Sequence, residues 1–65
     1  MKYREVTRFL RGQGWDLTRR RDSHEIWESG DGAFRFSVVQ NGGEVSPAVV
    51  KQLQRVFPDS PSDWN

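Results

Sequence analysis

Apolar and polar residues alternate most clearly in positions 15–39, which read WDLTRRRDSHEIWESGDGAFRFSVV. Three short segments of this stretch have the two-residue period of strands that bury one face. They cover residues 15–20, 23–28 and 33–39. Turn-forming residues separate them, at positions 21–22 and at the glycine-containing positions 29–32. The stretch therefore predicts three antiparallel strands joined by short turns.

The residues before this stretch have the spacing of an amphipathic helix over positions 3–11. Its apolar residues are Tyr3, Val6, Phe9 and Leu10. The segment 12–14, Gly-Gln-Gly, predicts the end of the helix, because glycine readily takes the left-handed conformation of a helix C-cap.

The residues after the stretch predict a loop at 40–43 and then a second helix. Ser46 is a favourable N-cap, and Pro47 suits the first helical position, where no N–H is needed. Val45 and Val50 occupy the two positions of a hydrophobic staple. The expected buried face of this helix consists of Val49, Val50, Leu53, Val56 and Phe57, with Pro58 ending the helix.

The order helix, three strands, helix predicts a single α+β domain over residues 1–58. We expect a three-stranded antiparallel sheet with both helices on one face and the other face open. Residues 59–65 form a polar, loosely held tail in which Trp64 docks on the body or on a partner. The large aromatic residues are assigned to the core rather than to base stacking. They are Trp15, Trp27, Phe34, Phe36 and Phe57.

Composition limits the classes of function. Cysteine is absent and histidine occurs once, so a disulfide or a dedicated zinc site is not expected, and no cofactor motif is present. No apolar run approaches the ~20 residues that span a bilayer. We expect a soluble, cytoplasmic protein without a membrane partner.

Charge is distributed unevenly along the chain. Residues 1–21 hold seven Lys or Arg against two acidic residues, a net +5, whereas the remaining residues carry a net −4. This asymmetry predicts a basic face for a polyanion such as RNA and a separate acidic face. Ordinary solvation of a small surface is the alternative interpretation.

The chain has one imidazole, His24. Imidazole groups exchange protons near neutral pH, because their unperturbed pKa is about 6.5. Strand alternation places His24 opposite Trp27, so it points to the open face with Glu28 if Trp27 is in the core. Ile26 shares the face of His24 and leaves the phase open. A surface or structural histidine is the alternative.

Basic residues lie near this histidine. Arg19, Arg20 and Arg21 precede it, and alternation puts Arg19 and Arg21 on one side of the strand and Arg20 on the other. Arginine binds phosphate through two parallel hydrogen bonds and stays charged, so these residues are candidate RNA contacts. Lys51 and Arg55, one helical turn apart, form a second basic stripe, for which a solvated surface is the stronger interpretation.

Three pieces of sequence are distinctive in their order and spacing. They are Gly14-Trp15-Asp16-Leu17-Thr18-Arg19, Asp22-Ser23-His24, and Val45-Ser46-Pro47-Ala48-Val49-Val50-Lys51-Gln52-Leu53. With them, residues 1–57 resemble the HicA (YcfA-like) family of toxins, whose signature at the second piece is Gly-Ser-His.

The resemblance implies a double-stranded-RNA-binding-domain-like fold, α-β-β-β-α, and an mRNA-cleaving endoribonuclease of a type II toxin–antitoxin pair. It carries the catalytic histidine of the family onto His24 and makes Ser23 a candidate RNA contact. It also implies a HicB-type antitoxin that covers this region. Asp22 replaces the usual glycine, and Val39-Gln40-Asn41 replaces a stretch that often contains a second histidine.

These observations predict metal-independent cleavage that uses the 2′-OH of the RNA. As base, His24 takes the 2′-OH proton while Arg19 or Arg21 stabilises charge on the phosphate; as acid, it protonates the leaving 5′-oxygen. The opposite role falls to water or to another group. The alternative is a non-catalytic RNA- or protein-binding module of the same fold, and a third possibility is a protein whose partner contacts the open sheet face and Trp64.

Overall fold

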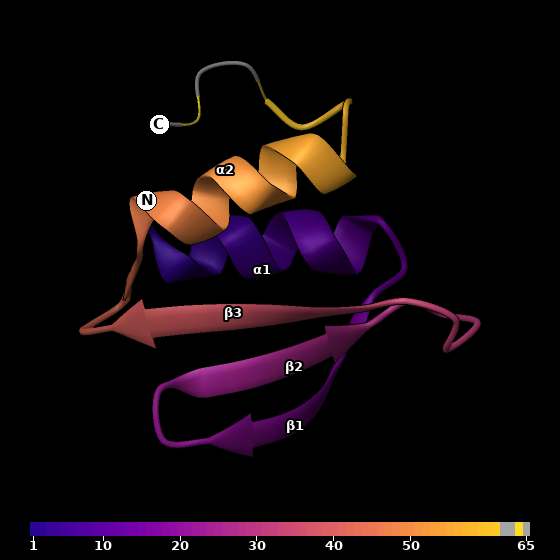
Figure 1. The fold of residues 1–65 in the computed structure, drawn as a ribbon, viewed down its shortest axis with the longest axis horizontal. Helices are drawn as coiled ribbons and strands as arrows, with labels where there is room; N and C mark the ends of the chain where they lie inside the picture. Colours follow the sequence, from indigo (N-terminus) through magenta and orange to yellow (C-terminus); the bar gives the residue numbers. More distant parts are fainter. Residues whose placement is uncertain (62–63, 65) are drawn as a thin grey trace.

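Two helices and four strands make up the computed structural model, which describes residues 1–61 and Trp64 (Figure 1). In chain order they are α1 (Tyr3–Gly12), β1 (Asp16–Arg21), β2 (His24–Glu28), β3 (Arg35–Asn41), β4 (Glu44–Val45) and α2 (Pro47–Val56). The strands form one antiparallel sheet in the order β1-β2-β3-β4. The predicted α+β class and the antiparallel meander are confirmed.

The prediction of three strands and a loop at 40–43 is wrong. β3 continues through Asn41, and the chain returns as β4, which pairs Gln40 with Val45 and Asn41 with Glu44. Gly42 and Gly43 connect the strands with φ angles of 57° and 81°. A two-residue hairpin turn with positive φ at both positions needs residues of this kind, so the paired glycines form a tight turn instead of a loop.

Local signals set the bounds of both helices. Gly14 has a φ of 84° two residues after α1 ends, as expected of a glycine that stops a helix. At the start of α2, the Ser46 hydroxyl accepts a hydrogen bond from the Val49 N–H at 3.4 Å, and Pro47 occupies the first turn. The expected staple residues, Val45 and Val50, are both buried. The predicted caps of α2 are confirmed.

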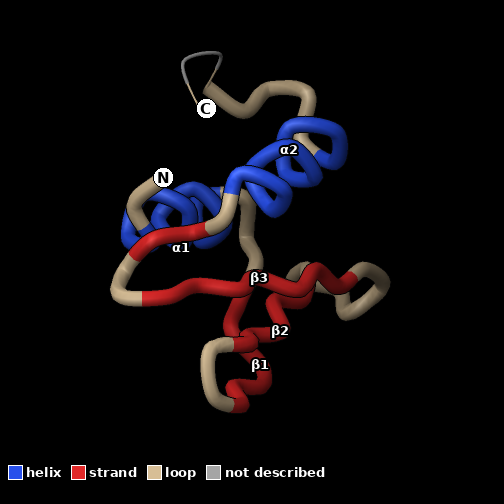
Figure 2. Tube along the Cα trace, turned by 60° about the vertical axis from the view of Figure 1, so that its left-hand side comes forward, coloured by secondary structure: helices blue, strands red, loops and turns tan. Residues whose placement is uncertain are grey.

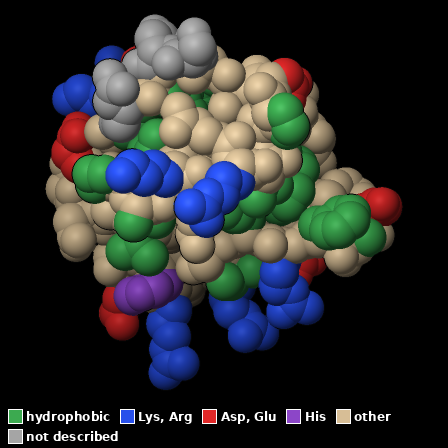
Figure 3. Space-filling view, turned by 45° about the horizontal axis from the view of Figure 1, so that its top comes forward, with side chains coloured by type: hydrophobic (Ala, Val, Ile, Leu, Met, Phe, Trp, Pro, Cys, Tyr) green, Lys and Arg blue, Asp and Glu red, His purple; other side chains and the backbone are tan. Residues whose placement is uncertain are grey.

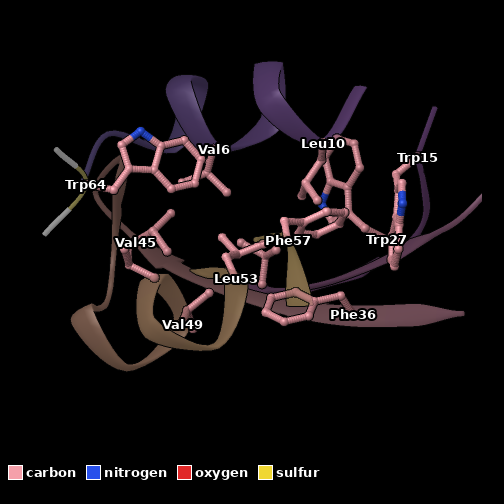
Figure 4. Packing of buried hydrophobic residues seen from close by; sticks show 12 residues of the cluster. Val6, Leu10, Trp15, Trp27, Phe36, Val45, Val49, Leu53, Phe57 and Trp64 are labelled. Carbon is pink, nitrogen blue, oxygen red and sulfur yellow. The ribbon is translucent and has the colours of Figure 1, made fainter. Parts of the chain in front are cut away.

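Both helices pack on the same face of the sheet (Figure 2). The core joins residues of α1, the inward face of β2 and β3, and α2 (Figure 4). Its members are Val6, Leu10, Trp15, Trp27, Phe36, Val38, Val45, Val49, Val50, Leu53, Phe57 and Trp64. Alternation along β3 confirms this face, because Phe36 and Val38 are buried whereas Arg35 and Ser37 are exposed.

Two residues assigned to the core lie outside it. Phe34 is 67% exposed, because β3 begins only at Arg35 and Phe34 belongs to the preceding turn, where its N–H donates to the Ser29 hydroxyl. Val56 is 51% exposed. It ends α2 at a point where β4, only two residues long, provides no strand to cover it. The predicted strand thus began too early at Phe34, whereas on the predicted helix face Val56 is exposed although Phe57 after it is buried.

Trp64 packs on the body of the protein. Its ring meets Phe9 edge-on at 5.1 Å between centroids, and the Gln54 side-chain amide donates to the Trp64 carbonyl at 2.9 Å. Phe9 in turn meets Phe57 edge-on at 5.3 Å. Of the two expectations for Trp64, docking on the body is what the structure shows, while residues 62, 63 and 65 of the expected tail lie outside the described residues.

A buried carboxylate joins α1, β1 and β2. Glu25, on the inward face of β2, is 1% exposed. Its oxygens accept hydrogen bonds from the Tyr3 hydroxyl at 2.6 and 2.8 Å, from Arg20 Nε at 3.1 Å and from Trp27 Nε1 at 3.0 Å. The Arg20 guanidinium also forms an ion pair with it at 3.1 Å. Glu25 is therefore a charge that is taken out of water and fully partnered.

Replacing Tyr3 with Phe tests this network. The change keeps the ring and removes one hydrogen bond to a charged group, so we expect the free energy of unfolding in urea to fall by about 1–2 kcal/mol. Glu5→Gln, on an exposed position of α1, is the control and should change stability by less than about 0.5 kcal/mol. Equal losses in the two variants would contradict a stabilising role for the Tyr3 bond.

The same network predicts a loss of stability in alkali. Burial raises the pKa of Tyr3 above its ordinary value of 10.0, and the hydrogen bond to Glu25 adds to the shift. Because folding raises this pKa, the contribution of Tyr3 is complete below pH 10 and is lost as the pH rises through the folded-state pKa. Urea unfolding midpoints measured between pH 8 and pH 11 should therefore fall more for the parent protein than for Tyr3→Phe.

Candidate functional site

The phase of β2 places the histidine on the open face. Trp27 is completely buried and Glu25 is 1% exposed, so these two residues point toward the helices. Because strand residues alternate, His24, Ile26 and Glu28 point to the opposite face. His24 is exposed, whereas Ile26 and Glu28 are half-buried. The phase that the sequence left open is thus resolved in favour of an exposed imidazole.

An irregularity in β1 determines which of its residues share this face. Leu17 pairs with Trp27 and Arg19 with Ile26, so Thr18 is an extra residue between them. Such a bulge reverses the facing of the residues that follow. Leu17 consequently lies on the helix side with Trp27, whereas Arg19 lies on the open face, which simple alternation through Leu17 would not give.

Arg21 and Arg19 are the cations nearest the histidine in the pairing register. Arg21 is the direct cross-strand partner of His24, and Arg19 is its diagonal neighbour. Directly opposite residues have Cβ atoms about 4.5–5.5 Å apart, and diagonal ones about 7–8 Å. Both arginines are exposed, and neither forms an ion pair with a carboxylate among residues 1–61. The prediction that they share one side is confirmed.

Arg20 occupies a different environment from its two neighbours. It pairs with Glu25 in the sheet register, so its side chain lies on the helix side. There its guanidinium contacts the Glu25 carboxylate at 3.1 Å and the Tyr3 hydroxyl at 3.4 Å. The structure does not bring Arg20 together with His24, although its side chain remains 59% exposed.

The turn between β1 and β2 holds His24 next to Arg21. Two residues, Asp22 and Ser23, connect the strands. Asp22 has a φ of 55°, the left-handed conformation that glycine adopts most easily and that Asp tolerates better than most residues. Ser23 is half-buried, and its carbonyl accepts from the Gln40 N–H at 3.1 Å. The backbone of this turn is therefore tied to β3.

Lys51 and Arg55 do not belong to this cluster. They lie exposed on α2, which covers the opposite side of the sheet from His24. Arg55 instead lines a groove between α2 and β3. The structure thus divides the predicted RNA contacts into a group around His24, the pair on α2, and Arg20, which contacts Glu25 on the helix side.

A shallow hollow of about 280 Å³ continues from this cluster along the open face. It is lined by Thr18, Arg19, Ile26, Glu28 and Arg35. Arg35 pairs with Glu28 across β2 and β3. It adds to the hollow a cation that was not among the predicted site residues. The alternation of Arg35-Phe36-Ser37 was the available signal, because an apolar Phe36 in the core requires an outward Arg35.

On the open face, an imidazole that can transfer protons lies beside guanidinium groups that can bind an anion. The imidazole (purple in Figure 3) lies at the surface with basic side chains beside it. Its ring forms no hydrogen bond with another part of the chain within residues 1–61, so a substrate proton can reach it. A phosphodiester held by Arg21 would lie within reach of the ring.

Comparison with known proteins assigns no family to this arrangement. No family model matches the chain, and neither the curated proteins nor the solved structures contain a match. Among the described residues, neither helix has the length and apolar character needed to cross a membrane.

Substitutions at Asp22 test the geometry of the turn. Asp22→Gly should leave the free energy of unfolding within about 0.5 kcal/mol of the parent, because the relief of strain offsets the added freedom of the unfolded chain. Asp22→Val should cost about 1–2 kcal/mol, because a β-branched residue fits poorly at a φ of 55°. Urea unfolding measures both. If valine were tolerated as well as glycine, the left-handed turn would be wrong.

Proposed function

We propose that this protein is an endoribonuclease of the HicA type, the toxin of a type II toxin–antitoxin pair, and that His24 is its general acid or base. The observation that carries the proposal is the exposed imidazole placed directly across the strand pair from Arg21, which has no ion-pair partner among the described residues. Cleavage of RNA through its 2′-OH needs a group that transfers protons and a cation that binds the phosphate, and His24 and Arg21 occupy adjacent positions for these roles.

The architecture and the sequence resemblance support this proposal. A helix, an antiparallel meander and a second helix on the same face are compatible with the double-stranded-RNA-binding-domain-like layout of the HicA family. β4 adds a short fourth strand to that layout. Asp22 adopts a positive φ at the position where the family signature has glycine, so the departure keeps the turn that presents Ser23 and His24.

The chemistry is a transesterification that uses the nucleophile of the substrate. Neutral His24 takes the proton of the 2′-OH while the 2′-oxygen forms a bond to phosphorus. The bond between phosphorus and the 5′-oxygen breaks, and a proton from water completes the leaving 5′-hydroxyl. Arg21, with Arg19 beside it, stabilises the charge that develops on the phosphate oxygens. The products are a 2′,3′-cyclic phosphate and a free 5′-hydroxyl.

The proposal includes a protein partner and a cellular setting. Because His24 is exposed, a protein that covers the open face would block access of RNA to it. A HicB-type antitoxin would do so in the cytoplasm, where the substrate is single-stranded or messenger RNA.

Replacement of His24 by Ala tests the catalytic role. We expect cleavage of single-stranded RNA to slow by about 100- to 10,000-fold with little change in RNA affinity, because general acid–base catalysis contributes this much to the rate. The parent should cut in EDTA, leave a 2′,3′-cyclic phosphate, and fail to cut RNA that is 2′-deoxy at the scissile nucleotide.

Gln13→Ala, at an exposed polar position that caps the end of α1, is the matched control and should cleave at the parental rate. If His24→Ala cuts RNA as fast as Gln13→Ala, the catalytic assignment fails. A parent protein that binds RNA without cutting it would instead be the non-catalytic binding module of the same fold.

The two neighbouring arginines provide a second test. Arg21→Gln should weaken RNA binding and reduce the slope of log K against log salt by about 0.7, the value for one phosphate contact on a single strand. Arg20→Gln should retain most of the salt slope but lower the free energy of unfolding, because it removes the cation that partners the buried Glu25. Filter binding at several salt concentrations, with urea unfolding, separates the two effects; a loss of slope only in Arg20→Gln would contradict the proposed site.

A further inference from the structure

Most of β3 has no strand on its outer side. β2 pairs with β3 from Arg35 to Val39, whereas β4 pairs only with Gln40 and Asn41. The first half of β3 is therefore a sheet edge, and β3 contacts α2.

Hydrogen bonds on either side of this segment show which backbone groups face the edge. The Gln40 N–H donates to the Ser23 carbonyl, and the Phe34 carbonyl accepts from the Ser29 N–H, so the even-numbered residues face β2. Backbone groups of successive strand residues point to opposite sides. The N–H and C=O groups of Arg35 and Ser37 consequently point away from β2, toward the unoccupied side.

A groove runs along this edge. It has a volume of about 460 Å³ and lies between β3 and the second half of α2. Its lining residues are Arg35, Phe36, Ser37, Gln52, Arg55 and Val56. Val56 is 51% exposed, although helix spacing assigned it to the core, and it forms an apolar wall opposite the strand. Free backbone hydrogen-bonding groups on the strand side and an exposed apolar side chain, Val56, on the helix side are features of a site for strand addition.

The charge of the groove is entirely basic. Arg35 and Arg55 line it, no acidic residue does, and Lys51 lies one helical turn before Arg55. None of the three forms an ion pair with a carboxylate among the described residues. The space-filling view that brings the α2 side forward shows Lys and Arg side chains on this face (Figure 3). An acidic ligand is therefore complementary to the groove.

The other two sheet edges are less suited to the addition of a strand. The edge at β4 is covered by the start of the chain, where Lys2 bridges to Glu44 and the Val45 N–H donates to the Met1 carbonyl at 2.8 Å. The outer edge of β1 carries three consecutive arginines, and charged edge residues oppose strand pairing. Within the part of the chain that the structure describes, only the edge of β3 combines free backbone groups with an exposed apolar side chain, Val56, beside it.

We propose that this groove binds an extended segment of a partner protein, in which acidic and apolar residues alternate, as an additional strand on β3. Residues of the segment opposite Arg35 and Ser37 would point to the open side, where a carboxylate meets Arg35. The intervening residues would point toward α2 and pack on Phe36 and Val56. This inference extends beyond the proposed ribonuclease activity and does not depend on it, because neither His24 nor Arg21 lines the groove, although Arg35 lines both the groove and the hollow of the open face.

Titration of the full chain with a peptide tests the proposal. The probe is an acetylated, amidated and fluorescently labelled Glu-Val-Glu-Val-Glu peptide, and its binding is followed by anisotropy and by amide NMR. We expect saturable binding with a Kd on the order of 100 μM. Amide hydrogen exchange should slow at Arg35 and Ser37 but not at Phe36, whose N–H already faces β2. The corresponding Lys-Val peptide should bind at least about tenfold more weakly.

Matched variants separate the contribution of the groove from nonspecific charge. Val56→Glu should weaken binding about tenfold, whereas Ala48→Glu, at an exposed position near the start of α2, should change it less than about twofold. Ser37→Pro removes the outward N–H at an edge position where proline is tolerated, and should weaken binding about fivefold relative to Ser37→Ala.

Three outcomes would overturn the proposal. One is the absence of saturable peptide binding up to about 1 mM. Another is binding that protects the β1 amides, or that is equally sensitive to Ala48→Glu and Val56→Glu. The third is displacement of the peptide by single-stranded RNA with protection of the same Arg35 and Ser37 amides, which would make the groove a nucleic-acid surface. None of these results depends on whether His24 cleaves RNA.

Discussion

The buried carboxylate of Glu25 is the constraint on which the arrangement of this domain depends. A charge that is 1% exposed is stable only if its oxygens are hydrogen-bonded, and here the donors come from three elements: Tyr3 in α1, Arg20 in β1 and Trp27 in β2. A shift of one residue in the phase of β2 would expose Trp27 and place His24 among the helices. The network thus specifies one phase for β2 and one position of α1 against the sheet.

This phase divides the arginine run of β1 between stability and the surface. Arg20 neutralises Glu25 on the helix side, whereas Arg19 and Arg21 remain on the open face with His24. The bulge at Thr18 allows this division, because it lets Leu17 face the core and Arg19 face outward. Three consecutive residues thus provide both a half-exposed cation that partners a buried carboxylate and two surface cations without an ion-pair partner among the described residues.

The shortness of β4 has consequences on the other side of the molecule. Two residues are enough to hold the start of the chain against the sheet, but they leave the outer side of the first half of β3 without a strand. The same gap leaves Val56 uncovered at the end of α2. The molecule consequently has a charged surface around His24 and a groove beside α2, and the two meet at Arg35, which lines both the open-face hollow and the groove.

The sequence by itself determined the elements whose signals are local. Helical spacing and the Ser46-Pro47 cap placed both helices, and strand alternation placed three of the strands within two residues of their observed bounds. It also showed that Arg19 and Arg21 share a side and that His24 is outward if Trp27 is buried. Tertiary structure alone decided that Trp27 is buried. It also decided the bulge at Thr18, the exposure of Phe34 and Val56, and the pairing of β4. Each of these depends on what lies opposite a residue in space, such as the donors around Glu25 or the strand missing beside Val56, and sequence periodicity contains no information about that.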